Sequence, residues 1–174
     1  SGTLTLAGVN SYTGQTVVSG GTLKQGAQGA FNASSSGYEV ASNGTLDLGG
    51  YSTSLASLGN TGNVNFGGTG GTVLNVAGNY TGNGGMMTVN TVLGGDDSKT
   101  DMLKVDGDTS GSTKLYVNNA GGSGAQTVNG IKVVDVSGSS NGSFSLANSY
   151  KTKDGQQAVV GGAYAYTLKQ GSKR

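Results

Sequence analysis

The amino-acid sequence predicts an all-β chain, folded as a right-handed parallel β-helix (a solenoid) with a C-terminal cap rich in hairpins. Three observations lead to this prediction. Short runs of alternating apolar and polar residues recur along the chain, separated by Gly, Asn and Ser. Several of these runs are variations of one phrase. Glycine accounts for 35 of the 174 residues, whereas proline, cysteine, histidine and tryptophan are absent.

The alternating runs are each about three to six residues long, the length of a short strand. In chain order they cover residues 3–6, 16–18, 45–48, 63–66, 73–76, 87–92, 103–105, 114–117, 131–136, 144–146 and 164–168. No sustained apolar spacing of three and four residues favours a helix. We therefore expect strands throughout the chain.

The repeated phrase favours a solenoid over other all-β folds. Its copies are GTLTLAG (2–8), GTLDLGG (44–50), GNVNFGG (62–68) and GTVLNVAGN (71–79), with a weaker copy in GGTLKQG (20–26). The irregular spacing of the copies suits coils that only have to stack on their neighbours, with loops of different length between them. Gly and Asn tolerate the left-handed backbone that sharp corners require. A β-sandwich stays an alternative, since it also has short strands and regular turns.

The pattern changes after about residue 95, where the turns become longer. The last coil of a solenoid exposes unpaired backbone groups, so a special end structure is expected there. We expect the stem coils over residues 1–94 and the cap over residues 95–174, within one continuous domain.

The composition excludes several classes of function. Without cysteine and histidine there is no thiolate or imidazole for catalysis or zinc binding. A net charge of +1 with scattered lysines gives no basic stripe for nucleic acid. No apolar run is long enough for a membrane-spanning helix. We expect no cofactor and no nucleic-acid partner. The chain starts at Ser1 without an initiator Met, and we expect it to be an excised segment.

The stretch LGGDDSKTDMLKVDGDTSGST (93–113) gathers five of the nine acidic residues. A calcium loop of the EF-hand type would end on a glutamate, but the only Glu in the chain is Glu39. We therefore expect no metal site, and interpret the acids as polar residues of turns and caps. Asp101 is expected to accept hydrogen bonds from backbone N–H groups. The residues in this group are Asp96, Asp97, Asp101 and Asp108.

An enzymatic function is not predicted. A glycosidase needs two carboxylates at a defined separation in a cleft, and such clefts usually also hold Arg, His or aromatic side chains. The only Arg in this chain is Arg174. The phrase GGTGG (67–71) lacks the Lys-Ser/Thr pair and the following helix of a phosphate-binding loop, so it is expected to form a corner.

From Asn75 onward the sequence resembles the pertactin-like C-terminal (autochaperone) region of autotransporter passenger domains, of the self-associating and diffuse-adhesin type. The phrases GNYTG, LGGDDSKTDML, GDTSG, NNAGGSGAQT, GIKVV and GAYAYTL occur in the order that this family shows. The similar part covers about half of the chain, and the glycine-rich first half fits a β-helical stem.

The resemblance implies a structural function at the surface of a Gram-negative bacterium, reached via the periplasm and the outer membrane. Such a region would nucleate folding of the passenger and assist its secretion. Its implied partners are the protein's own C-terminal translocator β-barrel and the upstream passenger coils. The alternative is an adhesive surface that contacts host cells or neighbouring cells, with a polar ladder formed by Asn60, Asn63, Asn65 and Asn75.

A folding nucleus in the cap would need a core of its own. We expect this core to contain the apolar residues of the later strands, where replacing a buried aromatic residue with Ala typically costs about 3–5 kcal/mol. The expected members are Leu103, Val105, Leu115, Val117, Ile131, Val133, Phe144, Leu146, Tyr164, Tyr166 and Leu168.

Overall fold

The structure is a computed structural model, and it describes residues 2–6, 14–27, 31, 37–95, 98–124, 131, 133–139, 141–147, 150–151, 156–161 and 164–167. The side chains of residues 150, 151, 157, 159–161, 164, 165 and 167 lie outside this description. The described residues form strands, bridges, turns and bends, with no helix among them. The prediction of an all-β chain is confirmed.

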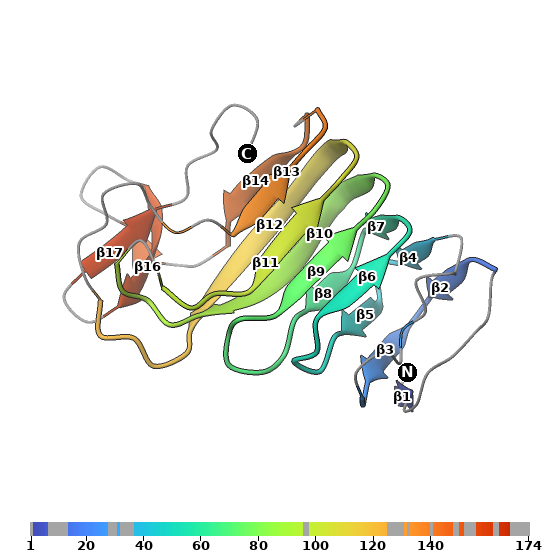
Figure 1. The fold of residues 1–174 in the computed structure, drawn as a ribbon, viewed down its shortest axis with the longest axis horizontal. Helices are drawn as coiled ribbons and strands as arrows, with labels where there is room; N and C mark the ends of the chain where they lie inside the picture. Colours follow the sequence, from blue (N-terminus) through green and yellow to red (C-terminus); the bar gives the residue numbers. More distant parts are fainter. Residues whose placement is uncertain are drawn as a thin grey trace.

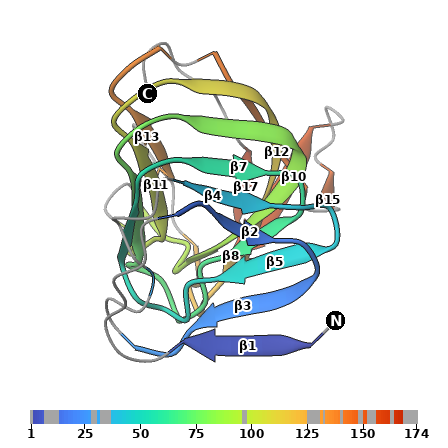
Figure 2. The same cartoon turned by 90° about the vertical axis from the view of Figure 1, so that its right-hand side faces the viewer.

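The strands stack in coils and line up on three faces (Figures 1 and 2). The first face contains β2 (Thr16–Val18), β4 (Tyr38–Val40), β7 (Leu58–Asn60) and the first parts of β10 (Tyr80–Thr91) and β12 (Thr109–Asn119). The second face contains β1 (Thr3–Leu6), β3 (Gly21–Gln25), β5 (Gly44–Asp47), β8 (Asn63–Asn65), the second parts of β10 and β12, and β14 (Ser143–Leu146). The third face contains β6 (Thr53–Leu55), β9 (Val73–Val76), β11 (Met102–Val105) and β13 (Val134–Val136).

All the strand pairs formed by β1 to β14 are parallel. β10 and β12 bend across the corner between the first and second faces, as Figure 2 shows. Tyr80 of β10 pairs with Leu58 of β7, whereas Met86 pairs with Asn63 of β8. Parallel strands that return to the same face coil after coil make this a parallel β-helix, and that prediction is confirmed.

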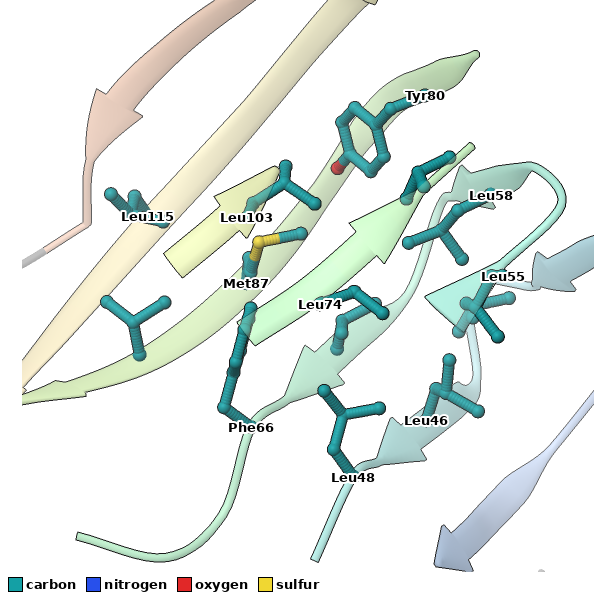
Figure 3. Packing of buried hydrophobic residues seen from close by; sticks show 14 of the residues in the cluster. Leu46, Leu48, Leu55, Leu58, Phe66, Leu74, Tyr80, Met87, Leu103 and Leu115 are labelled. Atoms are coloured by element: carbon teal, nitrogen blue, oxygen red, sulfur yellow. The ribbon is translucent and has the colours of Figure 1, made fainter. Parts of the chain in front are cut away.

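The core is a narrow column of side chains that point inward from successive coils (Figure 3). Because inward residues occupy equivalent positions in each coil, they stack along the axis of the helix. On the second face this ladder is Leu4, Leu23, Leu46, Val64, Met87, Leu115 and Leu146. On the third face a second ladder is Leu55, Val76, Val105 and Val136. Burying one such side chain contributes about 1.5–3 kcal/mol.

The first ladder is closed along most of its length and open at its N-terminal end. Leu46, Met87 and Leu115 are fully buried, whereas Leu4 is 61% exposed although it pairs in register with Leu23. Among the described strands, β1 pairs only with β3. The N-terminal end therefore presents a strand edge and an unfilled position above the core.

The pairing changes at the C-terminal end. β15 (Tyr150–Lys151), β16 (Gln157–Gly161) and β17 (Tyr164–Thr167) form an antiparallel sheet, called the cap sheet below. Parallel pairing itself continues past residue 94, since β11 to β14 still stack as coils. The division into a stem over 1–94 and a cap over 95–174 stays a prediction.

Candidate functional site

Asp101 is the most enclosed of the described acids in the 93–113 stretch, with none of its surface exposed. One carboxylate oxygen, Oδ1, accepts a hydrogen bond of 2.9 Å from the Thr72 backbone N–H. The other, Oδ2, accepts from the backbone N–H of Asn90 at 2.7 Å and from its Nδ2 at 3.2 Å. The Asp101 N–H donates in return to the Asn90 carbonyl at 2.9 Å. Asp101 thus joins the end of β10 to the segment that precedes β9.

Asn90 extends this network to two further coils. Its Nδ2 donates to the Gly67 carbonyl at 2.9 Å, and its Oδ1 accepts from Asn118 Nδ2 at 3.0 Å. Since buried polar groups cost stability unless they are paired, a network in which each group has a partner holds one register of the coils over others. The network is structural in form and has no open position for a substrate.

Burial raises the pKa of the Asp101 carboxyl above its ordinary value, because desolvation of the charge outweighs the hydrogen bonds from Asn90 and Thr72. The Tyr80 pKa is also raised by burial, against the lowering effect of hydrogen bonds to Thr113 and Asn60. A raised carboxyl pKa in a cleft would suggest an acid catalyst. Asp101 has no surface on a cleft, so its pKa has a consequence for stability instead.

The Asp106-Gly107-Asp108 triplet forms a corner between the third and first faces. The Asp108 N–H donates to Asn79 Oδ1 of the previous coil at 2.9 Å, and Asp108 Oδ1 accepts from the Ser139 N–H of the next coil at 2.7 Å. The Gly107 N–H donates to the Gly78 carbonyl at 2.9 Å. A Cβ atom on Gly107 would overlap the Gly78 carbonyl oxygen and Asn79 Oδ1. The triplet therefore stacks corner on corner.

No three His, Cys, Asp or Glu residues within the described ranges lie close enough together to hold a metal ion. Asp96 and Asp97 lie outside the described residues. The role of Asp96, Asp97 and Asp108 as polar residues of turns and caps stays a prediction. No helix in the described part of the chain is long and apolar enough to cross a membrane.

The expected core residues lie mainly inside the stack. Leu103, Val105 and Leu115 are fully buried, while Ile131, Phe144 and Tyr166 are partly buried and pack against the core cluster. Val117, Val133 and Leu146 are also buried. Leu168 lies outside the described residues, as does the side chain of Tyr164, whose backbone is part of β17.

The proposed asparagine ladder is wrong. Asn60 is fully buried and points inward from β7, whereas Asn63 and Asn65 lie on β8 and pair with Thr45 and Asp47 of β5. Asn75 lies on β9 of the third face. The four residues therefore lie on three different faces and form no common ladder.

A buried polar chain at the corner between the first and second faces was missed. Tyr80 is 1% exposed, and its hydroxyl shares a hydrogen bond of 2.8 Å with Thr113 Oγ1. Asn60 Nδ2 donates to the Met86 carbonyl at 3.0 Å and to the Tyr80 hydroxyl at 3.4 Å, and its Oδ1 has no partner among the described residues. The one available signal was the aromatic ring in GNYTG, an apolar residue among polar ones.

The loop after β10 connects the stack to the cap sheet. The Leu93 N–H donates to Asn119 Oδ1 at 3.3 Å, and the Leu93 carbonyl accepts from the Gly124 N–H at 3.0 Å. The Gly94 carbonyl accepts a hydrogen bond of 2.8 Å from the Tyr166 hydroxyl. The described residues thus form a stack of parallel coils with stacked corners, and an antiparallel sheet is tied to the end of this stack.

Comparison with known families agrees with this geometry. The family model described as Autochaperone Domain Type 1 matches residues 53–168. The chain belongs to the Autochaperone Domain Type 1 family. A second model, Passenger-associated-transport-repeat, matches residues 1–24. The match confirms the resemblance to the autochaperone region of autotransporters and starts earlier than the quoted phrases, at β6.

Several curated proteins are similar to this autochaperone chain. The adhesin BmaC autotransporter of Brucella suis biovar 1 (strain 1330) is 54% identical over 98 residues, covering 56% of this chain and 3% of the relative. Autotransporter adhesin AIDA-I of Escherichia coli is 44% identical over 96 residues, covering 55% and 7%. Uncharacterized protein YuaQ of Escherichia coli (strain K12) is 38% identical over 173 residues, covering 98% and 12%. The autochaperone chain thus spans a small fraction of the length of these relatives. The autotransporters among them indicate secretion across the outer membrane to the cell surface.

Proposed function

We propose that the chain is a structural segment that nucleates folding of the passenger β-helix at the cell surface and thereby assists secretion. The observation that supports this most is the pairing of β10 with β12, which runs from Tyr80–Thr109 to Thr91–Asn119. The other parallel pairs join strand segments of three or four residues. The autochaperone and adhesin relatives suggest a non-enzymatic passenger domain.

In a stack of coils, forming the first coils has a high free-energy barrier. Adding each later coil has a lower barrier, because the new coil pairs with a surface that already exists. The long β10–β12 ladder lies from Tyr80 onward, and the Asp101 network joins it to Thr72 of the segment before β9. A segment that forms such a ladder early lowers the barrier for the coils before it. A folded coil also cannot slide back through a narrow pore, so folding gives secretion a direction.

The proposed nucleus consists of core residues and polar groups between residues 96 and 168. The core part comprises Leu103, Val105, Leu115, Val117, Ile131, Val133, Phe144, Leu146, Tyr164, Tyr166 and Leu168, and the polar part comprises Asp96, Asp97, Asp101 and Asp108. The partners that we propose are the upstream passenger coils, for which the edge of β1 and the exposed Leu4 offer a continuation, and the protein's own translocator.

The test uses a full-length autotransporter that carries this chain. Deleting residues 75–174 is expected to leave the remaining passenger sensitive to protease at the cell surface, with insertion of the translocator unchanged. Retention of a protease-resistant passenger that has lost only attachment to cells would contradict nucleation and would support the adhesive alternative. Leu115→Ala is the point-mutant version, and Tyr116→Ala is its matched control, because Tyr116 is the next residue of β12 and is 41% exposed.

A further inference from the structure

An open cleft of about 400 Å³ lies on the outer side of the corner between the first and second faces. Figure 2 shows the bend of β10 and β12 at this corner. The cleft, called the corner cleft below, crosses several successive coils, and no described strand edge opens into it. It is separate from the Asp101 network and from the core.

Three glycines lie at this corner. Gly44 and Gly62 line the cleft at equivalent corners of successive coils, where an added Cβ would overlap the backbone carbonyl oxygens of Val18 and Ala41, so the coils approach each other closely there. Gly84 borders the cleft at a bulge, since the register of β10 against β12 shifts between Asn83 and Gly85. The positive φ of Gly84, +82°, is a conformation that glycine adopts readily and other residues avoid. The bulge thus leaves a hollow on the surface of the stack.

One wall of the corner cleft is a column of outward side chains. Thr45 pairs with Asn63, Asn63 with Met86, and Met86 with Lys114, so the column climbs one coil at a time. At about 4.8 Å a step, it spans about 14 Å along the axis. Ser42 and Thr61 line the cleft as well. A groove of this length and direction fits a linear chain of a few units better than a compact metabolite.

The chemistry of the wall is that of a carbohydrate site. Hydroxyl and amide groups donate and accept hydrogen bonds, as sugar hydroxyls require. Met86 is 38% exposed and offers an apolar surface to the C–H face of a sugar ring. The Asn63 Oδ1 atom is buried and has no hydrogen-bond partner among the described residues. Rotating this amide toward a ligand would therefore cost that oxygen no hydrogen bond.

Charge selects among sugars. Lys114 is exposed and makes no ion pair within the described part of the chain, and the lining contains no carboxylate. The corner cleft therefore favours an anion over a cation. A peptide that adds as a strand is disfavoured, because β5, β8 and β10 are each paired on both sides and offer no free edge.

We propose that the corner cleft binds an acidic oligosaccharide, with the Lys114 ammonium on its carboxylate and the Asn63 and Thr61 side chains on its hydroxyls. This site does not depend on the folding function, since Lys114, Asn63 and Thr61 lie outside the core cluster.

The test is a titration of the isotope-labelled full chain with tetragalacturonate, followed by backbone amide NMR. Shifts are expected at residues 42–45, 61–63, 84–86 and 114, weakening as salt is added because the ammonium–carboxylate attraction is screened. Maltotetraose, a neutral sugar of equal length, is expected to bind more weakly, as is a tetraglutamate peptide. Equal binding of either one, or the absence of shifts at these residues, would overturn the proposal.

Three variants check the residues. Lys114→Gln is expected to weaken binding of tetragalacturonate about 1.4-fold to fivefold, the range for one exposed charge pair. Lys24→Gln removes the same charge from an exposed residue of the same face outside the cleft, and is expected to change binding little. Asn63→Asp places a carboxylate in the wall and is expected to abolish binding. An equal loss in Lys24→Gln, or undiminished binding in Asn63→Asp, would contradict the site.

Discussion

The Tyr166 hydroxyl donates a hydrogen bond of 2.8 Å to the Gly94 carbonyl and so ties the cap sheet to the loop that follows β10. Tyr166 also packs against the core cluster. The two residues are distant in the sequence, and the chain segment between them includes the strands β11 to β14. Closure of the C-terminal end therefore depends on a contact that forms only when these coils are in place.

Replacing Tyr166 with Phe tests this contact. Loss of one hydrogen bond is expected to lower the free energy of unfolding by about 0.5–1.5 kcal/mol. Tyr116→Phe is the matched control, because Tyr116 is 41% exposed on the outer face. Urea denaturation measures both. Equal stability of Tyr166→Phe and the wild type would show that the contact contributes nothing.

Leu115→Ala tests the aliphatic ladder. Leu115 is fully buried between Met87 and Leu146, so truncation leaves a cavity and is expected to cost about 2–5 kcal/mol. Leu4→Ala makes the same chemical change at the exposed end of the ladder and is expected to stay within about 0.5 kcal/mol of the wild type. Similar losses in both variants, measured by chemical denaturation, would argue against a ladder with one open end.

Gly107→Ala tests the stacked corner. An added methyl group would overlap the Gly78 carbonyl and Asn79 Oδ1, and forcing it in is expected to cost about 1–3 kcal/mol. Gly20→Ala is the matched control, since a Cβ there meets nothing within 4 Å. The thermal melting temperatures of the two variants give the comparison. A melting temperature of Gly107→Ala that matches the control would mean that the corners are looser than described.

Asp101→Asn tests the buried carboxylate at neutral pH. The amide nitrogen would face a backbone N–H in place of an acceptor oxygen, because both carboxylate oxygens accept hydrogen bonds. Leaving a buried donor without a partner is expected to cost about 1–3 kcal/mol. Unfolding in urea at pH 7 measures the loss.

The pH dependence of the same pair of proteins follows from the direction of the pKa shift. Folding raises the pKa of Asp101, so the folded chain binds this proton more tightly than the unfolded chain. Its contribution to the free energy of unfolding is therefore largest below the unfolded pKa, about 3.9. The contribution falls as the pH rises through the folded pKa. The difference between wild type and Asp101→Asn is expected to shrink with rising pH, and a difference that grows would contradict the shift.

Much of the fold could be predicted from the sequence because period-2 patterning survives in a solenoid. The runs at 3–6, 16–18 and 73–76 match β1, β2 and β9 to the residue. Some strands were missed: β4, β6 and β7 are three-residue segments that contain Glu, Ser or Gly, too short for their alternation to stand out. Their extended conformation is imposed by pairing with the coils on either side, which no local pattern records.

The site was predicted in part. That Asp101 accepts hydrogen bonds from backbone N–H groups could be predicted, because Asp side chains often do so in turns. Its partners Thr72 and Asn90 come from other positions in the coils and could not be foreseen. The corner role of Gly107 was hidden because the triplet around it also resembles a calcium loop. Tyr80 was overlooked because an inward tyrosine next to polar residues looks like a surface residue until Thr113 is placed beside it.

The central claim is that the C-terminal coils form first and the earlier coils stack on them. Pulse-labelling hydrogen exchange during refolding of the chain measures this order directly. The account predicts that backbone amides of β10, β11 and β12 gain protection before those of β1 and β3. Protection of β1 and β3 first, or of all five strands in one step, would contradict it.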